Sequence, residues 1–329
     1  MTAERILAAF PRLSALVVGD ICLDRWCTYD PAETDLSRET GIPRIGVVST
    51  QITPGAGGTV ANNLAALGAG RVAVLGVTGD DGFGFELGRA LRSRGIEPDL
   101  LITTADVQTF TYTKIINGKS GVEDRPRLDF INTQPLAPDV ERAMIERLNA
   151  NAGEFDVIFV SDQAETSAGG AVTEGVRQWL AQWRTAYPDK IVWVDSRMRA
   201  DRFRKAIVKP NLQEAEECCR RLFSRVDFEA LRRHIDTDLL FVTHGERGVL
   251  VVEPGSESWV ETRPVENPVD ICGAGDSFSA GAGLALAATR LPVAAARMGN
   301  LVASVTIMKK GTGTASPDEV LAAEKRLQV

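Results

Sequence analysis

Short apolar runs rich in valine, isoleucine and leucine alternate along the chain with longer amphipathic stretches. In the longer stretches apolar residues recur every three or four positions, which predicts helices. Continuous apolar runs that alternate with helices are typical of parallel strands buried on both faces. The pattern therefore predicts an α/β fold, with a doubly wound, mostly parallel sheet and helices on both faces. The predicted strands are residues 16–18, 72–77, 157–160, 191–194, 207–208 and 239–242, and the clearest predicted helices are residues 84–94, 171–186, 213–222 and 228–235.

Two stretches, residues 23–52 and about 106–131, break this alternation. In the second, residues 109–116 alternate side chains that favour strands, and no helix pattern follows them. We expect the two stretches to pair as a small separate sheet, inserted into a single domain that spans residues 1–329. The chain shows neither an internal repeat nor a low-complexity segment, which excludes solenoids and linker-joined arrays.

Composition and charge narrow the classes of partner. Hydrophobic residues make up 44% and charged residues 25%, as in an ordinary globular protein. The net charge of −7 and isoelectric point near 5.2 provide no basic field for nucleic acid or an anionic membrane, although a local pocket for a small anion is compatible with them. No apolar run is long enough to span a membrane. The five cysteines form no CxxC pair, which favours reduced thiols and a cytoplasmic location.

Polar residues follow the predicted strands at the point where each strand ends. In open α/β sheets ligands bind beyond the carboxyl ends of the strands, where loops and helix amino termini converge. A single polar residue after a strand is usually an ordinary turn residue, but a whole set of them predicts a site. With only two histidines in the chain, catalysis must depend on carboxylates and backbone groups. The set is Gly19-Asp20, Ser161-Asp162, Asp195-Ser196, Pro210-Asn211 and Thr243-His244-Gly245.

The sharpest motif is Asp-Ile-Cys-Gly-Ala-Gly-Asp-Ser-Phe at residues 270–278, which precedes a helix of small residues at 279–288. Glycines let backbone amides point at an anion, and the dipole of the following helix favours negative charge there. Asp276 lies at the start of that helix, beside the expected anion hole. The alternative is that Asp276 is only a favourable acid in the first turn and the glycines allow close helix packing. Anion donors and an acid within a few residues favour the first interpretation.

A second glycine-rich segment, residues 54–68, also leads into a helix. Its turn would bind sugar hydroxyls by close backbone approach, or it is a plain loop with a helix cap at Thr59. Neither segment completes G-x-G-x-x-G, and G-x-x-x-x-G-K-[ST] does not occur in the chain. A dinucleotide-binding dehydrogenase and a P-loop enzyme are therefore both poorly supported.

These motifs resemble those of the ribokinase-like (PfkB) carbohydrate kinases, and the resemblance covers nearly the full chain. Residues 54–68 are similar to the first motif of the family, and residues 270–278 to the second, D-T-x-G-A-G-D. Within the family the chain is most similar to the heptose-7-phosphate kinase module of ADP-heptose biosynthesis. No part of the 329 residues resembles the nucleotidyltransferase domain that is fused to that module in bifunctional enzymes. The segments that carry this closer likeness are residues 19–24, 127–130, 161–162 and 209–214.

The resemblance implies an ATP-dependent, Mg²⁺-requiring kinase that transfers the γ-phosphoryl group to a hydroxyl of a sugar or sugar phosphate, with a heptose-7-phosphate-like acceptor favoured. Asp276 corresponds to the catalytic base, which takes the proton of that hydroxyl. The two β-rich stretches correspond to the family's lid, whose closure would exclude water. The remaining correspondences are the amides of Gly273, Ala274 and Gly275 (anion hole), Asn211 and Glu214 (phosphate and Mg²⁺), Thr243, Gly245 and Gly248 (nucleotide), and Asp24, Gly57 and Asp162 (sugar).

Four positions depart from the family pattern and affect the choice of acceptor and cation. Thr59 replaces an Asn of the first motif, and Cys272 replaces the Thr of the second. Relatives hold K⁺ at the positions of Asp270 and residues 311–316, and Cys272 puts that site in doubt. Glu165 stands where the heptose kinases carry Lys. Arg197 replaces a second Lys within a basic run that we expect to be mostly a solvated face.

Three alternatives therefore stay open beside a sugar-phosphate kinase. They are a kinase of an unphosphorylated sugar or nucleoside, a non-catalytic sensing module of the same fold, and, more weakly, a Rossmann dehydrogenase. If the acceptor carries a phosphate, Arg197 is the candidate to bind it, because its planar guanidinium suits phosphate geometry. We also expect a homodimer that forms through the lid, since a small sheet with one apolar face is only marginally stable without a covering partner.

Overall fold

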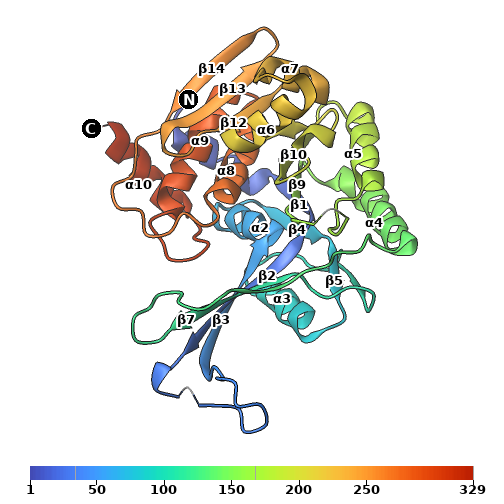
Figure 1. The fold of residues 1–329 in the computed structure, drawn as a ribbon. Coiled ribbons are helices and arrows are strands. Elements are labelled where there is room, and N and C mark those ends of the chain that lie inside the picture. Colours follow the sequence, from blue (N-terminus) through green and yellow to red (C-terminus); the bar gives the residue numbers. More distant parts are fainter. Residues whose placement is uncertain (34, 167, 329) are drawn as a thin grey trace.

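A computed structural model describes residues 1–33, 35–166 and 168–328 (Figure 1). Its main sheet has eight strands in the order β14-β13-β12-β11-β10-β9-β1-β4. The six strands from β12 to β4 are parallel, whereas β13 and β14 are antiparallel. This confirms the predicted α/β class and adds an antiparallel edge that the apolar pattern did not predict. The strands are β1 (Ser14–Gly19), β4 (Arg71–Leu75), β9 (Val157–Asp162), β10 (Ile191–Ser196), β11 (Ile207–Val208), β12 (Leu240–Thr243), β13 (Gly248–Glu253) and β14 (Ser256–Glu261).

Helices cover both faces of the main sheet, as Figure 1 shows, and alternate residues of each strand face opposite layers. In β1, Ala15 and Val17 belong to one apolar core and Leu16 and Val18 to the other. This two-sided burial explains the continuous apolar runs in the sequence. The first core packs against α1 (Ala3–Leu7), α2 (Gly57–Ala66), α3 (Gly82–Arg92), α8 (Ala274–Thr289), α9 (Pro292–Thr306) and α10 (Pro317–Gln328), and the second against α4 (Pro138–Asn151), α5 (Glu174–Ala186), α6 (Leu212–Phe223) and α7 (Phe228–Ile235).

The four clearest predicted helices are α3, α5, α6 and α7, with shifts at their ends. Helix α5 begins three residues later than predicted, because the Thr173 side chain accepts a hydrogen bond from the Val176 amide and fixes the first turn there. No helix among the described residues combines the length and apolar character needed to cross a membrane.

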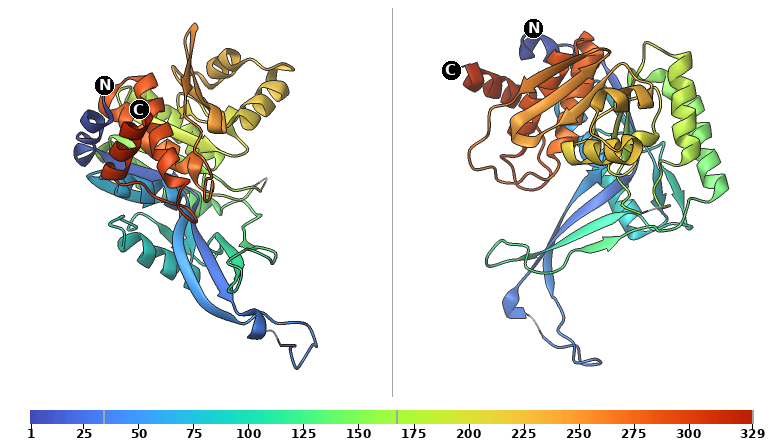
Figure 2. Two further views of the ribbon diagram at one scale, coloured as in Figure 1. Left: turned by 90° about the vertical axis from the view of Figure 1, so that its left-hand side faces the viewer. Right: turned by 45° about the horizontal axis from the view of Figure 1, so that its top comes forward.

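A second, smaller sheet of four strands projects from the main body (Figures 1 and 2). Its order is β3-β2-β7-β8, with β2 parallel to β7 and antiparallel to β3. Several apolar side chains of this small sheet and its loops are exposed, including Val48 at 63% and Leu128 at 55%. The strands are β2 (Ile21–Tyr29), β3 (Val47–Ala56), β7 (Thr111–Asn117) and β8 (Leu128–Phe130), and a separate parallel pair joins β5 (Val77–Gly79) to β6 (Ile102–Thr104).

Candidate functional site

Two adjoining hollows open at the carboxyl ends of the central strands. The larger, of about 740 Å³, lies between the β12–β13 turn and the start of α8. The smaller, of about 160 Å³, lies between the start of α8 and the small sheet. Gln163, Arg197, Gly273 and Asp276 line both hollows. A molecule in one hollow would therefore meet a molecule in the other beside Asp276.

The glycine-rich loop begins α8 in a conformation that only glycine adopts readily. Gly273 has a φ of 78°, and a Cβ there would approach the methyl groups of Thr59 and Thr312 at 3.2 and 3.3 Å. The Ala274 amide donates to the Ile271 carbonyl. Within the described residues the amides of Gly273 and Gly275 have no acceptor. Two of the three predicted anion donors are thus free to bind a ligand at a helix amino terminus.

Asp276 is partly buried at the junction of the two hollows. Burial raises the pKa of its carboxyl, and the nearby Asp195 carboxylate adds to the increase, so that it reaches about 8. Lys209 and Arg197 act in the opposite direction. A pKa near the working pH suits a group that acts as a general base.

A buried ion pair lies beneath the loop and has no counterpart among the predicted site residues. Lys209 Nζ lies 2.9 Å from Asp195 Oδ2, and both side chains line the larger hollow. Asp195 ends β10, and Lys209 directly follows β11. The sequence signals were present, since Asp195 was among the polar strand ends and Lys209 among the segments shared with heptose kinases. Neither signal showed that the two side chains meet.

Asn211 and Glu214 lie in the larger hollow and also form the cap of α6. The Asn211 Oδ1 accepts from the Glu214 amide at 2.9 Å, and Glu214 Oε2 accepts from the Asn211 amide at 2.8 Å. The N-x-x-E pattern thus has a structural role as a capping box. Thr243, Gly245 and Gly248, at the β12–β13 turn, line the same hollow.

Four cationic side chains gather around the smaller hollow, beside the carboxylate of Asp24. Burial raises the pKa of Asp24 to about 6, against the opposing effect of two of those cations, Lys114 and Arg127. Arg127 makes a bidentate pair with Asp129 at 2.6 and 2.7 Å. The four cations are Arg25, Lys114, Arg127 and Arg197.

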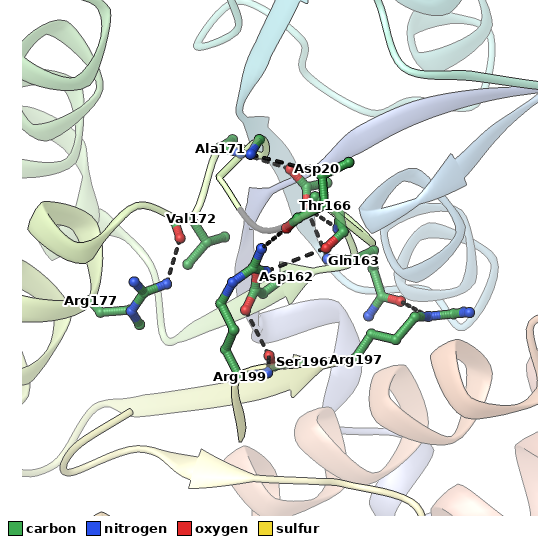
Figure 3. Close-up of polar contacts among 12 residues, drawn as sticks. Asp20, Asp162, Gln163, Thr166, Ala171, Val172, Arg177, Ser196, Arg197 and Arg199 are labelled. Carbon is green, nitrogen blue, oxygen red and sulfur yellow. Dashed lines mark hydrogen bonds and ion pairs between the residues drawn. The ribbon is translucent and has the colours of Figure 1, made fainter. Parts of the chain in front are cut away.

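Arg197 forms an ion pair with an acid at the edge of the smaller hollow. Its Nη1 lies 2.6 Å from Glu165 Oε1. Its Nε lies 3.4 Å from Gln163 Oε1, a contact that Figure 3 shows. The loop that carries these two partners is fixed by Asp20, whose carboxylate accepts the Gln163 and Ala171 amides at 2.8 and 2.7 Å. Glu165 and Arg197, which both depart from the family pattern, therefore form an ion pair with each other.

Two predicted sugar contacts do not reach the cleft surface. The Asp162 side chain is 1% exposed and binds Arg199 and Ser196 at 2.8 and 2.6 Å (Figure 3). Gly57 is buried at the start of α2, where a Cβ would lie 2.7 Å from the Ile21 side chain. Neither residue lines either hollow. Asp162 follows the pattern of a polar strand end, but the nearby Arg199 turns its carboxylate into the protein.

Asp270 joins the glycine-rich loop to residues 311–316. Its Oδ1 accepts from the Cys272 amide at 2.9 Å, and its Oδ2 accepts from the Gly311 amide at 3.1 Å. The Thr312 hydroxyl nearby is buried and has no hydrogen-bond partner among the described residues.

The protein side chains alone do not form a metal centre. Among the described residues, no three His, Cys, Asp or Glu side chains are grouped so that they could hold a metal ion. Mg²⁺ is commonly held by one or two carboxylates together with substrate phosphates and water. Asn211 and Glu214, the residues expected to serve phosphate and Mg²⁺, both line the larger hollow, and the Glu214 carboxylate fits a Mg²⁺ ion that is brought by a nucleotide.

Comparison with known proteins points to one family. The model of the pfkB family carbohydrate kinases matches residues 16–319. The bifunctional protein HldE of Pelobacter propionicus is 31% identical over 98% of this chain, and that of Methylococcus capsulatus is 32% identical over 96%. The chain spans 66% and 64% of the lengths of these two relatives.

Solved structures share the fold at lower identity. Phosphofructokinase-2 from Escherichia coli, in complex with potassium, superposes with a TM-score of 0.72 at 19% identity, over 96% of this chain and 100% of that one. Ribokinase from Arabidopsis thaliana, in complex with ribose and ATP, superposes with a TM-score of 0.68 at 17% identity, over 95% of this chain and 99% of that one.

Proposed function

Because the chain belongs to the pfkB family of carbohydrate kinases, we propose that it transfers the γ-phosphoryl group of ATP to a hydroxyl of a sugar phosphate, with a heptose-7-phosphate-like acceptor favoured. The observation that carries the proposal is that Asp276 and Gly273 line both hollows. ATP would occupy the larger hollow, whose volume of about 740 Å³ lies in the usual range for small-molecule sites. The acceptor would occupy the smaller one.

In this proposal Asp276 takes the proton of the attacking hydroxyl as the new bond to phosphorus forms. The free amides of Gly273 and Gly275 stabilise the charge that develops on the transferring phosphoryl oxygens. Mg²⁺ would neutralise charge on the ATP phosphates, with Asn211 and Glu214 as the residues that would hold it. Asn211, Thr243, Gly245 and Gly248 would line the nucleotide side, and Asp24 the acceptor side.

The preference for a phosphorylated acceptor is supported by charge. Four cations line the smaller hollow, against the three carboxyl groups of Asp24, Glu165 and Asp276. A phosphate on the acceptor would replace Glu165 as the partner of Arg197 and bring charge-assisted hydrogen bonds with it. The resemblance to heptose-7-phosphate kinases agrees with this assignment.

One observation favours the second candidate, a kinase of an unphosphorylated sugar or nucleoside. Glu165 already pairs with Arg197 at 2.6 Å, so one of the four cations is neutralised without a phosphate on the acceptor. The sugar-phosphate kinase is the first candidate, because the four cations that line the smaller hollow outnumber its three carboxyl groups.

An ADP-release assay with Mg²⁺ and ATP, across paired sugars and sugar phosphates and a set of nucleosides, tests the proposal. We expect the highest kcat/KM for a sugar phosphate. A higher kcat/KM for an unphosphorylated member of a pair would establish the second candidate, and no ADP release above the ATP-only background with any acceptor would contradict the kinase.

Two further features of the proposal concern the cation and the assembly. K⁺ would order the glycine-rich loop through Asp270 and residues 311–316, which the Asp270 hydrogen bonds to Cys272 and Gly311 already hold together. The small sheet would serve as the lid and would pair two chains, because its exposed apolar side chains need a cover.

A further inference from the structure

The Lys209–Asp195 pair lines the larger hollow together with residues of both predicted functions. Asn211 and Glu214 belong to the predicted phosphate and Mg²⁺ site, and Gly275 and Asp276 belong to the glycine-rich loop. A Cβ at Gly275 would lie only 3.4 Å from the Lys209 ammonium. The cation therefore lies directly beneath the loop whose amides face the cleft.

The Lys209 ammonium has unused hydrogen-bonding capacity. The side chain is 4% exposed, and its ammonium carries three donors. Within the described part of the chain only Asp195 accepts from it. Asp195 is itself held by Ser279, whose hydroxyl lies 3.4 Å from the same carboxylate oxygen. Two donors of a buried cation are thus left for a ligand in the hollow.

A purely structural role would leave this pair poorly explained. Burying two charges costs several kcal/mol for each ion, and an apolar pair of similar volume is often as stable. The free-energy cost of burying a cation is offset where the cation stabilises charge that develops during a reaction, in a place from which water is excluded.

We propose that Lys209, oriented by Asp195, donates hydrogen bonds to the phosphoryl group in transfer; the inference rests on the proposed function and adds a residue to it. The bond between the γ-phosphorus and the β–γ bridging oxygen breaks, and the bond from the acceptor oxygen to phosphorus forms. The hydroxyl proton passes to Asp276, and Lys209 keeps its own proton throughout. Lys209 contacts the reacting group, whereas Asp195 is a positioning residue.

Three variants separate this role from a structural one: Lys209→Met, Asp195→Asn and the double variant. We expect Lys209→Met to lower kcat by roughly 10²-fold or more, the range seen when one donor to a developing oxyanion is removed. Asp195→Asn should cost less, because the ammonium remains. Lys209→Met leaves the Asp195 carboxylate buried and unpaired, so its melting temperature should fall. The double variant should regain that stability without regaining turnover.

Binding provides a second readout that does not depend on turnover. By calorimetry, Lys209→Met should weaken binding of ADP with Mg²⁺ and aluminium fluoride, which imitates the phosphoryl group in transfer, much more than binding of ADP alone. Lys190→Met is the matched control, because Lys190 lies 3.9 Å from Asp156 at the opposite end of the same sheet. It should change neither binding nor turnover.

The outcomes distinguish this inference from the proposed function. An active wild type together with a double variant within a few-fold of wild-type kcat would overturn the role of Lys209 and leave the kinase intact. The same holds if Asp195→Asn loses as much turnover as Lys209→Met, or if the aluminium fluoride complex binds all variants alike. A wild type that phosphorylates no acceptor would instead contradict the proposed function. Should Lys209→Met fail to fold, the double variant and Lys209→Arg test the role of Lys209 in its place. Lys209→Arg is expected to retain part of the activity.

Discussion

Replacing Asp276 by asparagine should greatly slow phosphoryl transfer and at the same time stabilise the unliganded protein. The pKa of Asp276 is about 8 in the folded protein, against 3.8 for the same group in water. Between those two pH values the folded state keeps a proton that the unfolded state releases, so the carboxyl lowers the free energy of unfolding as pH rises from about 4 to about 8. A shift of one pKa unit corresponds to about 1.4 kcal/mol. Above about pH 8 the buried Asp276 carboxylate therefore lowers the free energy of unfolding by an amount on the order of several kcal/mol.

Asparagine cannot ionise, so the free energy of unfolding of Asp276→Asn does not fall over this pH range for that reason. The melting temperature of Asp276→Asn should exceed that of wild type at neutral and alkaline pH, and the difference should shrink as the pH approaches the ordinary pKa of an aspartate. Turnover, followed as ADP release, should fall by roughly 10²–10⁴-fold because the base is lost. Binding of ATP should persist.

The matched control is Asp318→Asn, which removes an exposed acid from the first turn of α10. An acid in that position stabilises a helix by about 0.3–1 kcal/mol, so the control should lose a little stability and no activity. If Asp276 were likewise only a first-turn acid, Asp276→Asn would also be slightly less stable than wild type and would turn over normally. Normal turnover would refute the assignment of Asp276 as the base, and lower stability would contradict the raised pKa of its carboxyl.

Three further predictions concern the acceptor, the cation and the assembly. Arg197→Ala should raise KM for the phosphorylated acceptor roughly tenfold or more, and KM for ATP far less, since a charge-assisted hydrogen bond contributes about 1.5–3 kcal/mol. The control Arg202→Ala, in the same basic run, should change neither KM. If Arg197→Ala changed only the KM for ATP, Arg197 would belong to the nucleotide side. Initial rates should be higher in K⁺ than in a bulky organic cation, and Asp270→Asn should reduce the difference; equal rates in wild type would mean that the site is lost at Cys272. Light scattering at micromolar concentration should give about twice the chain mass of 35.5 kDa, and Val48→Asp should give the single chain; a wild-type mass of one chain would contradict pairing through the small sheet.

The central strands were predictable because each is buried on both faces. That burial demands a continuous apolar run, and β1, β9, β10 and β12 all show one. The antiparallel strands β13 and β14 lie at the edge of the sheet, where Val260 is the only buried residue of β14. A strand with a single buried position resembles the surrounding loops, so the apolar pattern did not reveal β14.

The candidate site was predictable where the chemistry is local in the chain. Residues 273–276 bring amides and an acid together within one helix turn, so their spacing alone indicated an anion site. The partners of Asp195 and Asp162 come instead from other elements. Asp195 meets Lys209 and stays in the cleft, whereas Asp162 meets Arg199 and is withdrawn from it. Both aspartates follow the same strand-end pattern, and only the three-dimensional arrangement separates them.

Phosphorus NMR of one reaction tests the central claim most directly. Wild-type protein would be mixed with Mg²⁺, ATP and a heptose 7-phosphate, and the γ-phosphorus followed over time. We predict that its signal disappears as ADP forms, while a second phosphorus resonance appears on the sugar. Release of the γ-phosphoryl group only as inorganic phosphate, or phosphorylation of the unphosphorylated heptose in preference to its phosphate, would contradict the sugar-phosphate kinase.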